Sequence, residues 1–287
     1  MIINWYPGHM AKAKRLIQAN LKIIDVVIEL VDARIPWSST NPMISQLIGQ
    51  KPSVVVLNKA DLADAAVLDD WIRYYKTQGR LVMALNSKDG KGVKSLMSLV
   101  RRLAAPKLEH WRARGLKNRS VRTMILGIPN VGKSTLINKL ARRSAAKTAD
   151  KPGETKGKQW VHIGDQLDLL DTPGVLWPKL ENQVSAYRLA ATGAISDTVF
   201  DMETVITQLI TELGTWYPDE VKARFKLDSL CEAPLDTIEA IGRKRGCIVA
   251  GGVVDLEKTY KLILKEYREG KIGRISLDRV EEAKEDA

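Results

Sequence analysis

The sequence predicts an α/β fold in which a doubly wound, mostly parallel sheet is followed by a small all-helical domain. Short runs of apolar and β-branched residues, typical of strands buried in parallel sheets, occur at residues 23–31, 53–57 and 81–85. Helical patterns alternate with them at residues 42–48, 65–78 and 92–103. This alternation is typical of an open sheet with helices on both faces.

The second half of the chain changes from mixed to helical patterns. Strands are predicted at residues 121–126, 160–163 and 166–170, with a helix at 133–143. Residues 104–120 are polar and basic, which favours a linker. From about residue 181 the apolar periodicity is helical, at residues 184–191, 201–213, 218–225, 235–242 and 256–270. We therefore predict two domains, residues 1–180 and residues 181–287.

The composition allows two folded domains and argues against several other classes of protein. The 287 residues are 45% apolar, which is enough for two hydrophobic cores. No stretch resembles a signal peptide or a membrane span, so we expect a cytoplasmic protein that does not bind a membrane. Cys231 and Cys247 have no metal-ligand partner at zinc spacing, and we expect both thiols to be free and buried.

The positive charge of the chain is concentrated in one region. The formal net charge is +11, and residues 101–160 hold 16 Lys and Arg against 3 Asp and Glu. A region of this kind attracts phosphate backbones and makes binding sensitive to salt. The alternative is a solvated helix face together with the lysine of a phosphate-binding loop.

A phosphate-binding loop is predicted between a strand and a helix. Residues 127–134 read GIPNVGKS, which fits the pattern G-x-x-x-x-G-K-[ST]. In such loops backbone N–H groups and the lysine surround the phosphates, and the hydroxyl binds Mg²⁺. We expect Lys133 to contact the β- and γ-phosphates and Ser134 to bind Mg²⁺. The predicted phosphate-contacting residues are Asn130, Val131, Gly132, Lys133, Ser134 and Thr135.

Two segments further along the chain complete the predicted phosphate and metal site. Asp171 follows an apolar strand and begins the sequence DTPG, so it is placed to hold Mg²⁺ through water while the Gly174 amide meets the γ-phosphate. Thr155 lies in KPGETK, where a switch threonine would close on Mg²⁺. We therefore count Lys133 and Thr155 as catalytic candidates. The alternative for DTPG is a plain β-turn.

A guanine-reading motif is predicted upstream of the phosphate-binding loop. Residues 58–61 read NKAD, in which Asn58 would brace the nucleotide-binding loops and the stem of Lys59 would lie over the base. The Asp61 carboxylate can accept two hydrogen bonds from the N1–H and 2-amino groups of guanine, which adenine lacks. GTP or GDP is therefore the expected ligand, and an ATP-dependent enzyme is disfavoured. A backbone N–H for guanine O6 is expected from Asn86, Ser87 and Lys88.

The order of these motifs resembles a circularly permuted GTPase, and the complete set is similar to the ribosome biogenesis GTPase A family. The resemblance rests on WYPGHM at the N-terminus, DARIP at residues 32–36, NKAD, GIPNVGKST, PGETK and DTPG. It implies that residues 1–180 form the GTPase domain and that residues 181–287 form a helical RNA- or ribosome-binding domain. It also implies slow GTP hydrolysis, stimulated on the large ribosomal subunit, and binding to the rRNA of that subunit. We expect a monomer.

The catalytic arrangement departs from that of conventional GTPases. A water-orienting glutamine usually follows D-x-x-G, but this chain has Val175, whose side chain cannot hydrogen-bond a nucleophile. The resemblance implies that His9 acts on the attacking water. The alternative is that His9 packs against or caps the helix that begins near Met10.

Two further interpretations concern cations. Asn130 resembles the asparagine that helps hold K⁺ beside the phosphates in potassium-dependent GTPases, or else it is simply a turn-favouring residue. In the tail, Lys and Arg near Tyr260 and Tyr267 would grip RNA phosphates while the rings stack on bases. The alternative is a solvated amphipathic helix with i,i+4 ion pairs.

These expectations combine into two hypotheses about function. The first is a GTP-hydrolysing assembly factor that docks on rRNA of the large ribosomal subunit with GTP bound and leaves after hydrolysis. The second is a nucleotide-gated RNA-binding scaffold whose slow hydrolysis is incidental, which the missing glutamine favours.

Overall fold

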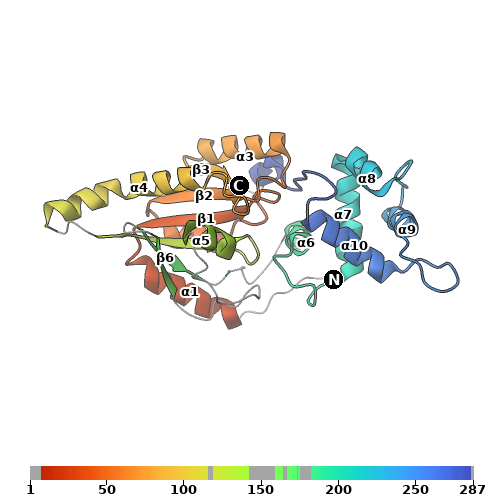
Figure 1. The fold of residues 1–287 in the computed structure, drawn as a ribbon, viewed down its shortest axis with the longest axis horizontal. Helices are drawn as coiled ribbons and strands as arrows, with labels where there is room; N and C mark the ends of the chain where they lie inside the picture. The colour runs from red at the N-terminus through yellow and green to blue at the C-terminus, as the bar shows by residue number, and fades with distance from the viewer. Residues whose placement is uncertain are drawn as a thin grey trace. The chain divides into compact units, whose positions relative to one another are not determined.

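The computed structural model describes residues 8–115, 119–141, 159–163, 167–172, 174 and 182–285. It divides into two compact units (Figure 1). The first unit contains the described residues before 180 together with residues 278–285, and the second contains the described residues between 180 and 277.

The first unit is built on a six-stranded sheet with the order β3-β2-β1-β4-β6-β5. Its strands are β1 (Val26–Asp32), β2 (Ser53–Asn58), β3 (Val82–Leu85), β4 (Val121–Gly127), β5 (Gln159–Ile163) and β6 (Leu167–Asp171). Only β5 runs antiparallel to its neighbour; the other pairs are parallel. The predicted doubly wound, mostly parallel sheet is therefore confirmed.

Helices cover both faces of this sheet because each presents an apolar stripe to it. They are α1 (Gly8–Leu21), α2 (Pro42–Ile48), α3 (Ala65–Thr77), α4 (Val93–Ala113), α5 (Lys133–Ala141) and α11 (Val280–Glu285). Residues of α1 and α2 pack with β1, β4 and β6 in one core cluster. Residues of α3 and α11 pack with β1 and β2 in another. Figure 1 shows α1 and α3 on opposite sides of the sheet.

The predicted linker at residues 104–120 is largely helical, because α4 continues to Ala113 through Pro106. The buried residues of the helix recur at helical spacing on both sides of the proline: Leu96, Val100, Ala104 and Trp111. Pro106 removes one backbone hydrogen bond, but this continuous buried stripe keeps the helix in place. Composition alone favoured a linker because the exposed positions of this stretch are mostly basic or polar.

The chain returns to the first unit at its C-terminal end, so the predicted second domain, residues 181–287, is too long. Asp278 is fully buried and its carboxylate accepts hydrogen bonds from the backbone N–H and the hydroxyl of Ser38, both at 2.7 Å. The backbone carbonyl of Asp278 accepts from Trp71 Nε1 at 3.3 Å. The helix α11 that follows has six residues, too few for sequence periodicity to indicate which unit it packs against.

The described residues of the second unit form helices and no strand, as predicted, apart from one isolated antiparallel bridge between Ile248 and Val254. The helices are α6 (Gln183–Thr192), α7 (Met202–Trp216), α8 (Pro218–Phe225), α9 (Pro234–Lys244) and α10 (Leu256–Arg268). The side chains of Asn182, Asp201 and Asp255 cap α6, α7 and α10 by accepting from backbone N–H groups of the first turn. No helix in the described ranges is long and apolar enough to cross a membrane.

Two sequence expectations for this unit are wrong: that tyrosine rings stack on RNA bases, and that both cysteines are buried. Tyr260 and Tyr267 are 5% and 2% exposed, so in this structure they are packed in the helical core and do not present faces to RNA bases. Glu266 is also buried, and it accepts hydrogen bonds from Arg224 and Arg245. Cys247 is buried as expected, but Cys231 is exposed. In each case the sequence pattern did not show which face of the local segment packs inward.

Candidate nucleotide-binding site

The predicted phosphate-binding loop connects the end of β4 to the start of α5. Asn130 and Gly132 adopt left-handed backbone conformations, with φ of 56° and 101°. Successive backbone N–H groups in such a turn can point into one concavity, which is the way protein loops hold phosphate. A Cβ built on Gly132 would lie 2.4 Å from Asn58 Nδ2, so this position has no room for a side chain. Ser134 and Thr135 follow in the exposed first turn of α5.

Lys133 is held inside the loop by backbone carbonyls. Its side chain is 8% exposed, and Nζ donates to Gly127 O at 3.0 Å and to Ile128 O at 2.7 Å. Burial lowers the pKa of Lys133 from 10.5 to about 8, although the carboxylate of Asp171 opposes the shift. An anion placed in the loop would offer Nζ the negative partner that two neutral carbonyls only partly replace.

The DTPG segment meets the phosphate-binding loop. A Cβ built on Gly174 would lie 2.8 Å from Pro129 Cα and 2.9 Å from Lys133 Nζ, so the Gly174 backbone lies directly against the loop. Thr172 Oγ1 donates to Ile125 O at 2.6 Å and fixes the segment to β4. Asp171, at the end of β6, is half-buried and close enough to interact electrostatically with Lys133.

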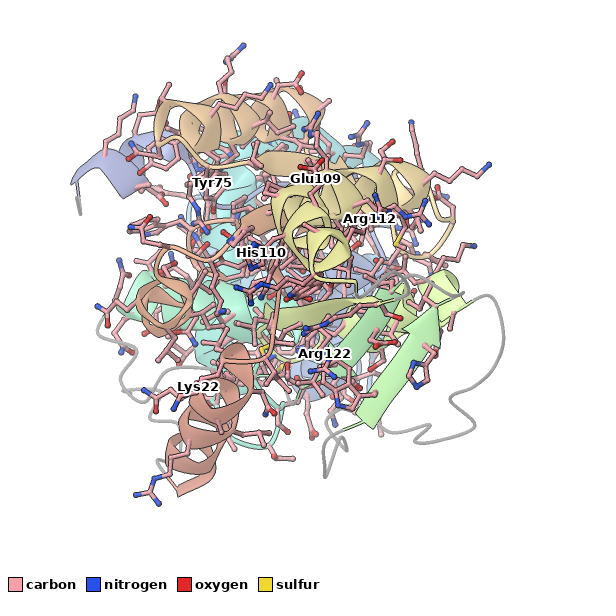
Figure 2. All side chains as sticks on the ribbon, turned by 90° about the vertical axis from the view of Figure 1, so that its left-hand side faces the viewer. Lys22, Tyr75, Glu109, His110, Arg112 and Arg122 are labelled. Carbon is pink, nitrogen blue, oxygen red and sulfur yellow. The ribbon has the colours of Figure 1, made fainter. Side chains whose placement is uncertain are left out.

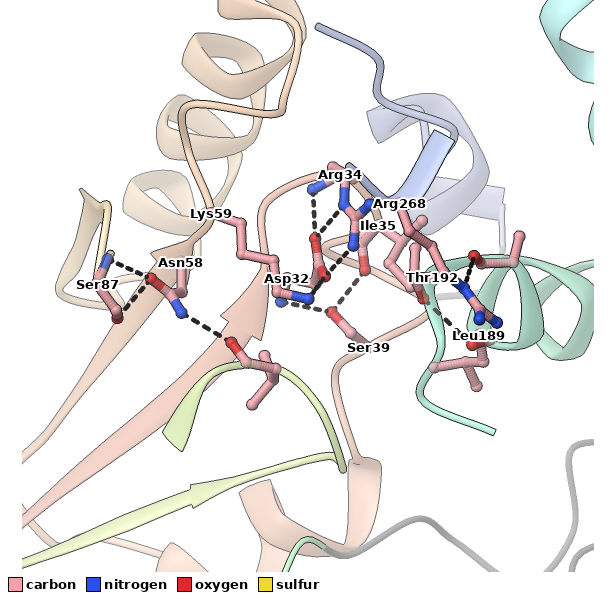
Figure 3. A network of polar contacts seen from close by, with 12 residues as sticks. Asp32, Arg34, Ile35, Ser39, Asn58, Lys59, Ser87, Leu189, Thr192 and Arg268 are labelled. Carbon is pink, nitrogen blue, oxygen red and sulfur yellow. Dashed lines mark hydrogen bonds and ion pairs between the residues drawn. The ribbon is translucent and has the colours of Figure 1, made fainter. Parts of the chain in front are cut away.

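Asn58 joins three sequence-distant segments at the carboxyl end of the sheet (Figure 3). Its Nδ2 donates to Val131 O at 2.8 Å, within the phosphate-binding loop. Its Oδ1 accepts from the backbone N and the Oγ of Ser87, at 3.0 and 2.7 Å. NKAD, NSK and the loop therefore meet at one buried side chain, and these are the hydrogen bonds that the predicted bracing role of Asn58 would use.

The backbone N–H groups of Asn86, Ser87 and Lys88 already donate within the protein. Asn86 N donates to Lys91 O, Ser87 N to Asn58 Oδ1, and Lys88 N to Asn86 Oδ1 at 2.8 Å. A contact from this segment to guanine O6 would require one of these N–H groups to be shared or released. That contact stays a prediction.

Lys59 and Asp61 lie on the loop after β2. Lys59 has a left-handed backbone, with φ of 59°, and its Nζ pairs with Asp32 Oδ2 at 2.9 Å. Asp61 is exposed, and its side chain forms no hydrogen bond or ion pair within the described ranges. A carboxylate in this position is accessible to a ligand.

Asp32 also belongs to the site. The sequence marks it only as part of DARIP and predicts no contact for it. It is 2% exposed and binds Arg34 through Nε at 3.0 Å and through a terminal nitrogen at 2.9 Å, besides Lys59 (Figure 3). Burial alone would raise the pKa of Asp32, but the two cations outweigh burial and hold the pKa well below its ordinary value. One sequence feature could have indicated this role: Asp32 is a carboxylate at the end of an apolar strand, and the next strand in the chain carries NKAD.

Two predicted residues fall where the structure says nothing of their side chains. Thr155 lies outside the described residues. His9 belongs to the first turn of α1, but its side chain is not described. The roles of both stay predictions.

The arrangement fits a guanine nucleotide with a hard metal ion. Lys133 and the N–H groups of a left-handed turn suit phosphate, and the exposed Asp61 carboxylate suits the edge of guanine. The hydroxyl of Ser134 and the carboxylate of Asp171 are oxygen donors of the type that Mg²⁺ prefers. The strands that carry the two motifs, β2 and β4, are separated only by β1, so both motifs lie at the same edge of the sheet.

Comparison with known proteins agrees with this geometry. The model of the family described as 50S ribosome-binding GTPase matches residues 122–224. The chain is 49% identical to ribosome biogenesis GTPase A of Priestia megaterium over 99% of both chains. It is 46% identical to ribosome biogenesis GTPase A of Bacillus cereus, covering 98% of this chain and 95% of that one. The solved structure of GNP-bound YlqF from T. maritima matches with a TM-score of 0.67 and 29% identity, over 93% of this chain and 98% of that one.

The fold and the site define a P-loop GTPase in which β2, the strand before NKAD, precedes β4, the strand before the phosphate-binding loop. It binds GTP and GDP, and it hydrolyses GTP. The chain belongs to the ribosome biogenesis GTPase A family.

Binding of GDP should take up a proton above about pH 8, because phosphate beside Nζ raises the lowered pKa of Lys133. The bound state then holds more protons than the free state, so affinity falls as pH rises from about 8 to 9. Calorimetry at about pH 8.5 in two buffers of different ionisation enthalpy measures the uptake. Lys133→Arg is the control, since its guanidinium stays protonated in both states. Equal enthalpies in the two buffers for the unmodified protein would contradict the prediction.

Proposed function

We propose that this GTPase is an assembly factor of the large ribosomal subunit, which docks on rRNA with GTP bound and leaves after hydrolysis. The observation that carries the proposal is the junction at Asn58, which joins base-reading and phosphate-binding segments into one site. Nearly full-length similarity to proteins named for ribosome biogenesis supplies the partner class. Cations on both units supply the charge that rRNA binding needs.

The nucleotide contacts follow from the positions of the motifs. Asp61 would read guanine, the stem of Lys59 would lie over the base, and Lys133 would neutralise the phosphates. Ser134, Asp171 and Thr155 are the proposed Mg²⁺ ligands, with Asp171 acting through water. Mg²⁺ would supply charge neutralisation at the phosphates. The chain itself contributes positioning and fixed dipoles, which lower the barrier without a covalent step.

A conformational change that depends on the bound nucleotide would reach the second unit through DTPG. Gly174 lies against the phosphate-binding loop, and α6 begins a short distance further along the chain, at Gln183. A rearrangement of Gly174 that depends on the γ-phosphate would therefore pull on the start of the helical unit. In this way a local contact at the phosphate could change how the helical unit presents itself to rRNA.

In the helical unit, RNA would contact cations rather than stacked tyrosines. Arg224 and Arg245 are paired with the buried Glu266 and are less available. Lys258 and Lys265 are exposed on α10. Lys261 pairs with Glu257 on the same helix, as the amphipathic interpretation expected. The proposed RNA contacts of this unit are therefore fewer than the sequence indicated.

Sedimentation with separated ribosomal subunits tests the function most directly. We expect the protein with a non-hydrolysable GTP analogue to pellet with the large subunit, and the GDP form to stay mostly in the supernatant. Asp61→Asn, which should weaken guanine binding, is the control and should lose the GTP-analogue effect. Equal pelleting in both nucleotide states, or pelleting with the small subunit alone, would contradict the proposal.

We expect His9→Ala to lower ribosome-stimulated GTP turnover by at least about tenfold while leaving GTP affinity unchanged, because general-base contributions of this size are typical. Single-turnover hydrolysis with and without large subunits is the measurement. Unchanged stimulated turnover would remove His9 from the mechanism and favour the alternative, a nucleotide-gated RNA-binding scaffold with incidental hydrolysis.

K⁺ should accelerate hydrolysis relative to Na⁺ if Asn130 helps to hold a monovalent cation beside the phosphates. The left-handed, exposed Asn130 at the tip of the loop is compatible with this role. Turnover measured in the two salts at equal ionic strength, with Asn130→Asp as a comparison, decides the matter. Equal rates in the two salts would remove K⁺ from the account.

A further inference from the structure

The C-terminal half of α4 extends past the end of the sheet (Figure 1). The helix has 21 residues, of which four are buried: Leu96, Val100, Ala104 and Trp111. These four hold α4 against the unit, and the side opposite them faces solvent. The side chains on this exposed side indicate what α4 can bind.

The exposed side of α4 is rich in positively charged side chains. Four exposed arginines lie between the middle of α4 and the residue just past its end: Arg101, Arg102, Arg112 and Arg114. None of their four side chains forms an ion pair or a hydrogen bond with a residue in the described part of the chain. The one acidic residue in the stretch from 101 to 115 is Glu109. We call these four arginines the α4 arginine row.

Further cations surround the base of the row. Lys107 pairs with Asp25 at 2.6 Å and lies 5.2 Å from the centre of the Trp111 ring, and Arg119 lies 3.5 Å from the same centre. The pKa of Lys51 is lowered by burial and by the nearby charge of Lys107. The Asp25 carboxylate therefore faces the charges of both Lys107 and Lys51.

Figure 2 views the first unit from this end, and Lys22, His110, Arg112 and Arg122 are visible there together. The C-terminal part of the row lies near the edge of the sheet where β1 begins, because Lys107 of α4 pairs with Asp25, which directly precedes Val26. The nucleotide motifs follow the opposite ends of parallel strands, after Asn58 and Gly127. This part of the arginine row is therefore remote from the nucleotide site.

We propose that the α4 arginine row binds the phosphate backbone of structured RNA and gives the GTPase unit its own RNA-contacting surface, separate from the helical unit. This inference rests on the proposed rRNA-docking function and assigns part of it to named residues. From Arg101 to Arg114 the row spans about 20 Å of helix, which suits a succession of phosphates rather than a single anion.

The same observations disfavour other occupants. A membrane-binding helix exposes large apolar side chains beside its cations, but every large hydrophobic side chain that is exposed in the described residues lies outside α4. A protein partner would need an apolar interface core, which this face lacks for the same reason. Arginine is also the side chain best suited to phosphate, because its planar guanidinium donates two parallel hydrogen bonds.

The test is a charge reversal with a matched control. Arg101→Glu with Arg112→Glu changes two members of the row. Arg73→Glu with Lys76→Glu changes two exposed cations of α3 and alters the net charge equally. Binding to large-subunit rRNA is measured at several salt concentrations for the full-length protein with a GTP analogue. GDP affinity and the thermal unfolding midpoint are measured alongside.

We expect the α4 variant to bind RNA about tenfold more weakly, and its slope of log affinity against log salt to fall by roughly 2. The α3 control should bind nearly as the unmodified protein does, and GDP affinity should be unchanged in both. Arg101→Lys with Arg112→Lys should retain most of the affinity, because the charges remain.

Equal losses in the α4 and α3 variants would overturn the proposal, because net charge and not this surface would then govern binding. Unchanged RNA binding in the α4 variant would also overturn it, as would a loss confined to binding of anionic lipid vesicles. If the unmodified protein fails to bind rRNA in any nucleotide state, the proposed function fails with it. If the unmodified protein and the α4 variant both bind RNA normally, the proposed role of the arginine row is wrong, while the proposed rRNA-docking function stands.

Discussion

The site depends on one buried amide side chain. Asn58 is 1% exposed, and its two polar atoms bind segments that lie 29 and 73 positions away in the sequence. Burying a side-chain amide costs free energy unless each of its polar atoms forms a hydrogen bond. Burial of Asn58 therefore favours a fold in which the phosphate-binding loop and the segment at Ser87 lie beside it. The order of the strands in the chain is then unimportant. What matters is that β2 and β4 end at the same edge of one sheet.

Two lysines of the site are held by different kinds of partner. Lys133 is bonded to two neutral carbonyls, while Lys59 is held by the buried carboxylate of Asp32. The first lysine gains a better partner when phosphate arrives, and the second is already oriented beside the base-reading loop. Preorganisation of this kind reduces the reorganisation needed at the moment of reaction. Because burial lowers the pKa of Lys133, this lysine links nucleotide binding to protonation.

Local motifs were predictable from the sequence, and long-range packing was not. Each short motif predicts a backbone conformation or a set of hydrogen-bonding groups within a few residues, as in GIPNVGKS, NKAD and DTPG. The runs of β-branched residues predict the strands of the sheet. The pairing of Asp278 with Ser38 and of Asp32 with Lys59 joins distant or unmarked residues, so no local pattern indicates it. The burial of Tyr260, Tyr267 and Glu266 likewise depends on which face of a helix packs, and alternating charge hid that face.

The central claim is that Asn58 unites the base-reading and phosphate-binding halves, and the affinity of Asn58→Ala for GDP tests it most directly. The substitution leaves Val131 O and Ser87 N without their partner, so we expect affinity to fall by at least about tenfold in a protein that still unfolds cooperatively. Asn138→Ala, on the exposed side of α5, is the control and should bind as the unmodified protein does. Equal GDP affinity in Asn58→Ala and Asn138→Ala would contradict the account.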